Sequence, residues 1–454
     1  MSASQTKKVC LVSLGCSKNL VDSEVMLGIL KESGAEITPE AADADVIIVN
    51  TCGFINDAKE ESIDAILALA KNKKAGRCSR LVVTGCLSQR YKDELAKEMP
   101  EVDCFVGTGE YHRIAEVIKD GFTRRVLVGL PTYIHDYDTP RLLSTPSYYA
   151  YVKVAEGCSN HCSYCSIPAI RGEMRSRSVE SVVREAASLA GQGVKEINLI
   201  AQDTTSYGFE RGGELIRLLR ALVRVDGIEW IRLLYLYPGK ITDELISVMK
   251  GEEKIVSYID LPLQHISERV LKAMNRRYAR RDIEAVIEKL RKEVGGVTLR
   301  TSLIAGFPGE TDKEFKELLS FIEDARFDRL GVFTYSREEG TPAFNLEKQV
   351  SAKVKAERMD ILMQAQRAIS LEKNEMLIGR RIKTLIEGGE AEAGGDGYVP
   401  PLQAREGRLK GRASSQAPDV DGAVCITKGM ALPGTMAEVL VTGAEDYDII
   451  GEIT

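Results

Sequence analysis

Short apolar runs alternate with helical patterns along residues 1–135. Four of these runs predict buried strands, at residues 8–14, 45–50, 81–85 and 104–106. Stretches whose apolar residues recur every three or four positions follow them and predict helices, near 20–33, 57–71, 88–98 and 110–119. Because this alternation is typical of parallel sheets with crossover helices, we expect residues 1–135 to form a parallel α/β domain.

The same alternation continues between residues 144 and 378. Six apolar runs predict strands, at 149–155, 195–200, 229–235, 256–260, 297–304 and 329–335. Helical patterns lie between them, for example at 179–190, 213–224, 281–293 and 311–325. Six strand–helix units are two fewer than an eightfold barrel has, so we expect an open, partial (β/α)6 barrel. A proline-containing stretch at 131–147 is expected to be a linker or surface loop, and 351–377 a long polar helix.

From about residue 380 the chain changes to glycine-rich, short β-like runs. These runs lie at 381–387, 397–405, 423–427 and 436–443. Glycine and proline separate them, which is typical of small closed all-β folds. We therefore expect residues 379–454 to form a small five-stranded barrel and the chain to be an α/β protein of three domains.

Composition narrows the class of protein. The net charge of −6 over 454 residues is unlike that of a basic nucleic-acid binder. No apolar run reaches eighteen residues, so no membrane-spanning helix is expected, and the N-terminus lacks a signal-peptide pattern, so we expect a cytoplasmic protein. Ten cysteines in that compartment point to metal or redox chemistry, the alternative being small buried hydrophobic residues.

The run EGCSNHCSYCSIPAIRG places three thiols at Cys158, Cys162 and Cys165, directly after the first barrel strand. Thiolates are the usual ligands of a [4Fe–4S] cluster, and three of them leave one iron open. An open iron can chelate the amino and carboxylate groups of S-adenosylmethionine, whose one-electron cleavage gives a carbon radical. The spacing therefore predicts a radical-generating catalytic site, at the end of the barrel where such sites lie.

Two other interpretations compete for this triplet. A structural zinc ion needs a fourth ligand, and His161 lies inside the loop, where it cannot easily point the same way as its neighbours. Three unrelated core cysteines are the second alternative. Three thiols within eight residues, among Gly157, Asn160 and Pro168, make that alternative poor.

A second triplet follows from periodicity. Cys16, Cys52 and Cys86 each stand just after a predicted strand. The carboxyl ends of parallel strands meet at one edge of a sheet, so these thiols are expected to converge on a second cluster. The alternative is that each is simply buried at a strand end. The buried-residue interpretation is the better one for the remaining four cysteines, Cys10, Cys78, Cys104 and Cys425.

With six cysteines placed, the chain resembles the methylthiotransferases of the radical S-adenosylmethionine superfamily. The resemblance covers nearly the whole chain and is carried by the runs at 12–24 (VSLGCSKNLVDSE), 198–208, 259–267, 299–315, 331–343 and 411–422. One departure is Ser17, where proline is common. The resemblance implies a three-cysteine domain, a radical core and a C-terminal TRAM barrel. It also implies two [4Fe–4S] clusters, of which the second holds or supplies sulfur, S-adenosylmethionine, and a reductant such as flavodoxin or ferredoxin.

Further candidate cofactor contacts lie at strand ends. Gly306, Gly309 and Glu310 form the run GFPGE, which in this superfamily packs beside the adenine. The alternative is a plain turn before a helix capped by Thr311 or Asp312. Three more candidates are Gln202, Asp203 and Tyr164, with a turn or a core aromatic as alternatives.

Two groups of basic residues are weaker candidates. His265 also follows a strand, and a structural histidine is the better interpretation of it. Arg171, Arg175 and Arg177 are candidate contacts to a substrate carboxylate or to the cofactor, with a solvated surface as the alternative.

The substrate is predicted from the tail. Residues 383–454 carry twelve acidic and six basic side chains, the opposite of a phosphate-binding surface. An acidic tail suits a basic protein, and the runs at 12–24 and 411–422 most resemble the branch that modifies the β-carbon of an aspartate in ribosomal protein S-twelve. We expect a monomer without tight nucleic-acid binding. The alternatives are an enzyme acting on an adenosine of transfer RNA and an electron carrier or redox sensor, which releases no 5′-deoxyadenosine.

Overall fold

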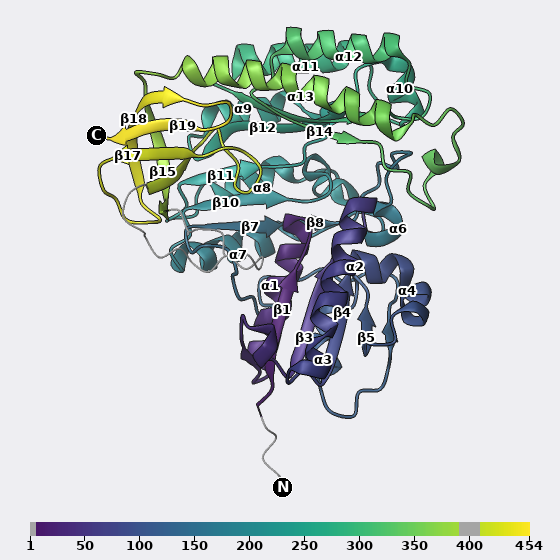
Figure 1. Ribbon diagram of the computed structural model, residues 1–454. Coiled ribbons are helices and arrows are strands. Elements are labelled where there is room, and N and C mark those ends of the chain that lie inside the picture. The colour runs from purple at the N-terminus through teal and green to yellow at the C-terminus, as the bar shows by residue number, and fades with distance from the viewer. Residues whose placement is uncertain (1–5, 390–408) are drawn as a thin grey trace.

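The computed structural model describes residues 6–389 and 409–454. Figure 1 shows three parts, each built on its own sheet: an N-terminal α/β part, a central sheet with its helices, and a small β-barrel beside it. The expected strand at 397–405 lies outside the described residues. No helix in the ranges 6–389 and 409–454 is long and apolar enough to cross a membrane.

The N-terminal sheet is parallel, with the order β2-β1-β3-β4-β5-β6. Its strands are β1 (Lys8–Ser13), β2 (Glu36–Ile37), β3 (Val46–Thr51), β4 (Arg80–Gly85), β5 (Cys104–Val106) and β6 (Val126–Leu127). Its helices are α1 (Ser17–Glu32), α2 (Asn56–Ala70), α3 (Asn72–Ala75), α4 (Cys86–Glu98) and α5 (Ile114–Val117). Alternate residues of one strand enter opposite cores, for example Ile48 and Ile47 of β3, so both faces of the sheet are covered.

The central sheet is also parallel, in the order β14-β13-β12-β11-β10-β7. Its strands are β7 (Tyr149–Lys153), β10 (Glu196–Ile200), β11 (Trp230–Leu233), β12 (Ile255–Gln264), β13 (Thr298–Ala305) and β14 (Arg329–Thr334). Because β7 and β14 are the two ends of this order, the sheet is open, and the predicted partial barrel is confirmed.

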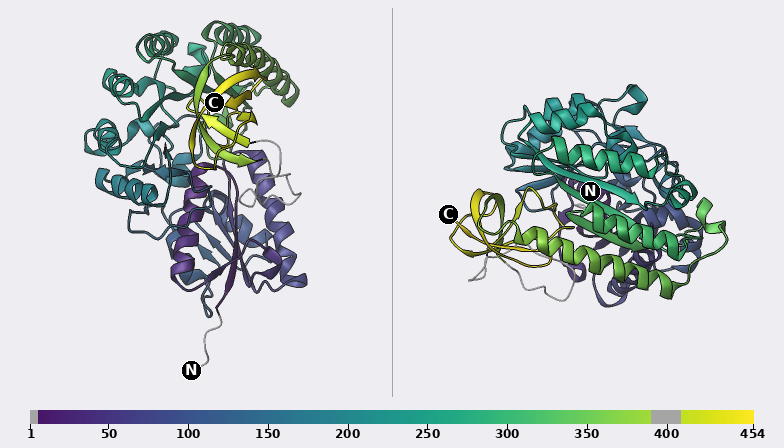
Figure 2. Two further views of the ribbon diagram at one scale, coloured as in Figure 1. Left: turned by 90° about the vertical axis from the view of Figure 1, so that its left-hand side faces the viewer. Right: turned by 90° about the horizontal axis from the view of Figure 1, so that it is seen from above.

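Helices cover the outside of the central sheet, as Figure 2 shows. They are α7 (Val179–Gly191), α8 (Leu215–Leu222), α9 (Asp243–Gly251), α10 (Glu268–Ala273), α11 (Arg280–Glu293), α12 (Asp312–Ala325) and α13 (Ala352–Glu375). Helices α9 and α10 were not among those predicted from the sequence. A capping box of Thr311 and Glu314 begins α12 just after the GFPGE turn. Between β7 and α7 lie β8 (Ala155–Glu156), α6 (Ile167–Arg171) and β9 (Arg175–Ser176), where the first cysteine triplet is found.

The C-terminal barrel is closed and five-stranded, as expected. Its order is β15-β16-β17-β19-β18, with β15 (Arg381–Gly389), β16 (Leu409–Ala413), β17 (Val424–Lys428), β18 (Met436–Ala444) and β19 (Ile449–Ile453). Neither β16 nor β19 was predicted. The run LKGRA of β16 is polar because its Arg412 is buried against Glu196 of the central sheet, so it lacks the apolar alternation of a strand.

Candidate functional site

The first cysteine triplet lies on the loop between β8 and α6. Cys158 and Cys162 are buried, Cys165 is half-buried, and none of them is in a disulfide. Backbone hydrogen bonds fix the loop. The amide of Cys158 donates to the carbonyl of Gly172, directly after α6, at 3.0 Å, and the amide of Cys165 donates to the carbonyl of Cys162 at 3.1 Å. Gly157 has a φ of +80°, and a Cβ there would meet a backbone oxygen at 2.2 Å. Only glycine therefore fits beside the triplet.

The thiols of this loop are close enough to affect one another's ionisation. Burial raises the pKa of Cys158 to about 11 and that of Cys165 to about 12, and the neighbouring Cys162 raises both. The backbone amides of Asn160 and Ile167 donate to the sulfurs of Cys158 and Cys165 and act in the opposite direction. Three thiolates at such a site need positive charge between them, which the irons of a cluster supply.

The donor set fits a cluster better than a single zinc ion. Within the two described ranges, no three His, Cys, Asp or Glu side chains are arranged to hold one metal ion. His161 is exposed, and its Nε2 lies 3.3 Å from the carboxylate of Glu173, so its ring is engaged at the surface. A four-iron cluster is larger than one ion and takes its cysteines at wider separations.

The second triplet comes from three adjacent strands. Cys16, Cys52 and Cys86 follow β1, β3 and β4, which are neighbours in the sheet. Burial raises the pKa of Cys52 to about 12, and the thiols of Cys86 and Cys16 raise it as well, so the structure brings the three together. Gly15 has a φ of +92°, and a Cβ on it would lie 2.8 Å from the Cβ of Cys52. The role of both triplets as cluster ligands stays a prediction.

Arg171 links the second triplet to the central part of the chain. Its guanidinium donates to Sγ of Cys86 at 3.5 Å and to Oδ1 of Asn19 at 2.5 Å. It also forms ion pairs with Asp22 at 2.7 Å and with Glu156 at 3.1 Å. Since Arg171 is only 1% exposed, its charge is available to these partners and not to a substrate.

The network continues toward the first triplet. Lys153 is buried between the carboxylates of Asp22 and Glu156, and Nε2 of Gln202 donates to Glu156 at 2.9 Å. Burial raises the pKa of Glu156, but Arg171 and Lys153 outweigh it and hold that pKa below its usual value. Two cations and two carboxylates thus neutralise each other in a buried layer between the two cysteine triplets.

The acidic residues of the run VDSE were not assigned a role from the sequence. Asp22 contacts the network above, and Glu24 accepts hydrogen bonds from Nε of Arg141 at 2.9 Å and from the amide of Ser144 at 2.8 Å. Both carboxylates lie on α1 and are buried. The sequence carries one signal of this burial: the charged positions of α1 do not gather on a separate, solvated face of the helix.

For Arg171 and Arg177 the structure shows neither a substrate contact nor a solvated surface. Arg177 is buried and paired with Glu185, so neither it nor Arg171 is free to hold a substrate carboxylate. Arg175 forms no ion pair within the described residues and donates to the backbone carbonyls of Glu173 and Arg171. The stretch 131–147 is a linker without helix or strand, as expected, and Arg141 anchors it to Glu24 and Glu185.

The polar strand-end residues have different surroundings. Oε1 of Gln202 is buried and has no hydrogen-bond partner within the described ranges, so it fits an ammonium donor such as that of S-adenosylmethionine. Asp203 instead accepts from Nδ2 of Asn160 and from Lys240, both at 2.7 Å, and caps the next turn. Tyr164 packs beside Phe307 and the cluster of side chains around it. For Asp203, the turn-and-cap alternative is what the structure shows.

The GFPGE turn is fixed by its own side chains. The carboxylate of Glu310 accepts from the amide of Gly306 at 2.7 Å and pairs with Arg358 at 2.9 Å. A Cβ on Gly306, whose φ is +75°, would lie 2.4 Å from Lys355, and Gly309 has a φ of +79°. These glycines are therefore required by the turn itself, and their contact with a cofactor stays a prediction.

His265 is a buried structural residue. Its Nδ1 accepts from the amide of Ser267 at 3.0 Å. Burial lowers its pKa to about 3, so the ring is neutral at physiological pH. This agrees with the structural interpretation of the sequence.

The tail's acidic excess does not form one surface. Asp419 accepts from Tyr151 at 2.8 Å and Asp421 from Tyr258 at 2.6 Å, both on the central sheet. Glu387 is engaged by Arg412 at 2.6 Å. Several of the acids counted above are therefore used in internal contacts, and the charge argument for a basic partner is weaker than the sequence suggested. Six of the counted charged residues lie outside the described residues: Glu390, Glu392, Asp396, Arg405, Glu406 and Arg408.

A buried glutamate attaches the N-terminal part to the segment after β14. Glu338 is 2% exposed and pairs with Arg90 of α4 at 2.6 Å and Lys59 of α2 at 3.0 Å. Arg90 also donates to the carbonyl of Gly53 at 3.0 Å, next to Cys52. Burial raises the pKa of Glu338, but hydrogen bonds from Ser336, Lys59 and Arg90 outweigh it and keep the carboxylate ionised.

Replacing Glu338 by Gln should lower the free energy of unfolding by about 3 kcal/mol, because it leaves the buried guanidinium of Arg90 without its counter-charge. Urea unfolding followed by circular dichroism measures this loss. The matched control is Glu339→Gln, since Glu339 is exposed and offers Arg90 only its backbone carbonyl, at 2.7 Å. Equal stability of the two variants would show that Glu338 does not secure the attachment.

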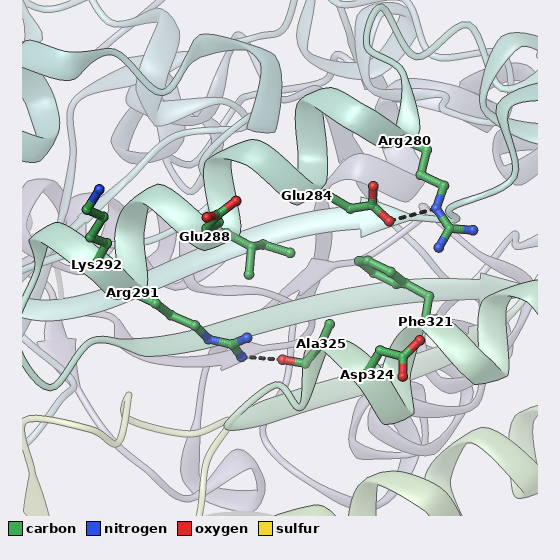
Figure 3. A pocket seen from close by; sticks show the side chains of 9 residues that line it. Arg280, Glu284, Glu288, Arg291, Lys292, Phe321, Asp324 and Ala325 are labelled. Carbon is green, nitrogen blue, oxygen red and sulfur yellow. Dashed lines mark hydrogen bonds and ion pairs between the residues drawn. The ribbon is translucent and has the colours of Figure 1, made fainter.

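A surface groove of about 510 Å³ lies between α11 and α12 (Figure 3). Phe321 and Ile287 are among its lining residues. Arg280 is bonded to Glu284, and Arg291 donates to a carbonyl at the end of α12. The groove contains no cysteine and no residue predicted for the site. It belongs to the outer helical layer and does not mark the reactive centre.

Comparison with known proteins agrees with this arrangement. Three family models match: the uncharacterized protein family UPF0004 at residues 8–107, the radical SAM superfamily at 152–322 and the TRAM domain at 378–454. A solved radical S-adenosylmethionine methyltransferase, TsrM from Kitasatospora setae, covers 86% of this chain and 78% of its own at 16% identity, with a TM-score of 0.56. At that identity the likeness shows the fold alone.

Full-length relatives are much closer in sequence. The chain is 53% identical over 458 residues to the ribosomal protein uS12 methylthiotransferase RimO of Geotalea uraniireducens, covering 100% of both chains. It is 53% identical over 452 residues to the protein of the same name from Geobacter sulfurreducens, with 98% of each chain covered. The chain therefore belongs to the radical S-adenosylmethionine methylthiotransferases, the family of the RimO proteins.

Proposed function

We propose that this protein attaches a methylthio group to the β-carbon of an aspartate in ribosomal protein uS12. The observation that carries the proposal is the 53% identity along the whole length of an enzyme named for that activity. The presence of two separate cysteine triplets supports it, because a methylthiotransferase needs both a radical source and a source of sulfur.

Two [4Fe–4S] clusters and S-adenosylmethionine are the cofactors. Cys158, Cys162 and Cys165 hold the radical-generating cluster, and Cys16, Cys52 and Cys86 hold the second, which carries the sulfur to be inserted. With S-adenosylmethionine, such a cluster supplies a carbon radical that can take a hydrogen atom from an unactivated C–H bond.

The chain's own residues bind and orient these groups. The free Oε1 of Gln202 receives the ammonium group of S-adenosylmethionine, with Tyr164 alongside. Gly306, Gly309 and Glu310 shape the turn that borders the adenine. The neutral layer of Asp22, Lys153, Glu156 and Arg171 sets the spacing between the two cysteine triplets.

The oligomeric state, the location in the cell and the electron donor belong to the same proposal. The enzyme works as a monomer in the cytoplasm, where its ribosomal substrate is made, and a flavodoxin or ferredoxin supplies its electrons. It divides into three domains, residues 1–135, 144–378 and 379–454. The separate sheets and the three matched regions support this division.

The direct test is an anaerobic assay of the reconstituted protein with S-adenosylmethionine, a chemical reductant and purified uS12, with a parallel reaction on transfer RNA. Intact-mass spectrometry should show a gain of about 46 Da on uS12, one methylthio group replacing hydrogen. A uS12 variant with alanine at the target aspartate is the control and should gain nothing. If uS12 is unchanged while transfer RNA gains the group, the substrate is the adenosine.

A further inference from the structure

Three buried or half-buried cations lie close to the predicted cluster ligands, one for each of three thiols. Arg171 donates to Cys86 at 3.5 Å. Lys240 lies near enough to Cys158 to lower its pKa. Arg276 donates to Cys162, also at 3.5 Å. These cations differ in whether another group already neutralises them.

Two of the three cations are neutralised by carboxylates. Arg171 is paired with Asp22 and Glu156. Lys240 is paired with Asp203 at 2.7 Å. Each of these cations and its partners therefore present little net charge to the sulfur that they approach.

Arg276 has no such partner. Its guanidinium donates to the hydroxyl of Tyr278 at 2.6 Å, to the carbonyl of Pro262 and to Sγ of Cys162. It lies over the rings of Tyr237 and Tyr278, 4.4 and 5.0 Å from their centroids. No carboxylate in the described ranges forms an ion pair with it, although it is only 9% exposed. A buried guanidinium without a counter-ion is costly unless an anion completes its site.

We propose that Arg276 is a positioning residue for the radical-generating cluster. The unneutralised positive charge of its guanidinium lies at Cys162 and stabilises the reduced form of that cluster. The proposal deepens the proposed function and rests on it. Reduction adds one electron from a one-electron donor and no proton, so the site becomes more negative by one charge. A fixed positive charge in a site of low effective dielectric favours that change and raises the reduction potential.

The chain offers a matched control in the adjacent residue. Arg277 carries the same charge one position further along, but its side chain is exposed. Solvent screens an exposed charge, whereas it screens a buried one much less. Arg276→Gln and Arg277→Gln therefore remove the same charge from almost the same place, and only the first should affect the cluster.

The test is a potentiometric titration of the reconstituted two-cluster enzyme, followed by electron paramagnetic resonance. The signal that changes when S-adenosylmethionine is added reports the radical-generating cluster. For Arg276→Gln we expect its potential to fall by at least 59 mV, a tenfold loss of reduced cluster at a fixed potential. Arg277→Gln should match the wild type, and Arg276→Lys, which keeps the charge, should shift less than Arg276→Gln.

Each outcome has a defined meaning. An unchanged reduction potential in Arg276→Gln overturns the proposal. It does so even if the affinity for S-adenosylmethionine falls, because that result means that Arg276 binds the cofactor. If Arg276→Gln loses iron, the Arg276→Lys variant decides. A cluster near the wild-type potential in Arg276→Lys supports the proposed role of the charge. Loss of iron in both variants shows that Arg276 is structural and overturns the proposal. If the wild type gives no signal that responds to S-adenosylmethionine, the proposed function itself has failed.

Discussion

Replacing Cys158, Cys162 and Cys165 together by alanine should abolish cleavage of S-adenosylmethionine. The three thiols are the predicted ligands of the cluster whose open iron binds the cofactor, and no other group of described cysteines follows the barrel strand where they lie. Release of 5′-deoxyadenosine, measured by liquid chromatography under reducing conditions, should drop to background. The iron content should fall from about eight to about four per chain, because the second cluster remains.

The matched control is Cys10→Ala, which removes a buried thiol from the core of the N-terminal α/β part and leaves both triplets intact. It should keep full iron content and full cleavage. If the triple variant loses all its iron, the two clusters are not independent. If the wild type never binds more than about four irons, the interpretation of the second triplet is wrong.

Replacing Cys52 by alanine should separate the two halves of the reaction. Its thiol belongs to the second triplet, in the N-terminal sheet, whereas cleavage depends on the triplet after β8. Alanine keeps the Cβ that packs against Gly15, so the local backbone should be undisturbed. We expect 5′-deoxyadenosine release to persist at a level comparable to the wild type, while methylthiolated product disappears from the mass spectrum.

The result that counts against this assignment is loss of cleavage in a folded Cys52→Ala variant that retains its first cluster. Circular dichroism and the iron content establish the fold and the loading. Cys10→Ala again serves as the control, and it should retain both cleavage and product.

The strands and most helices could be predicted because their cores are apolar and periodic. Ile47 and Ile48 of β3, for instance, are both completely buried, as the continuous apolar run implied. One of the elements that were missed, β16, is polar for a tertiary reason. Arg412 of β16 sits in a buried ion pair with Glu196, and that partner is 216 residues away in sequence. No local pattern could have shown it.

The candidate site was also predicted only in part. Cys16, Cys52 and Cys86 could be placed from strand periodicity, because each follows a strand of one parallel sheet. Spacing alone placed the other triplet. The charged layer around Arg171 could not be predicted, since its carboxylates come from two distant segments of the chain. The same reason explains why Arg171 was mistaken for a substrate contact.

Arg276 shows the limit most clearly. The run NRRY contains two adjacent arginines, and nothing local distinguishes them. Only the fold buries the side chain of Arg276 beside Cys162 and leaves that of Arg277 exposed. A residue that acts on a cluster through space is identified by its three-dimensional neighbours.

The central claim is that uS12 is the substrate, and mass spectrometry of cells that lack this protein tests it most directly. Ribosomal protein and transfer RNA are analysed from the same cells. We predict that uS12 loses about 46 Da, the mass of a methylthio group replacing hydrogen, while methylthio-adenosine in transfer RNA persists. Loss of the modified nucleoside with unchanged uS12 would contradict the account and assign the enzyme to transfer RNA.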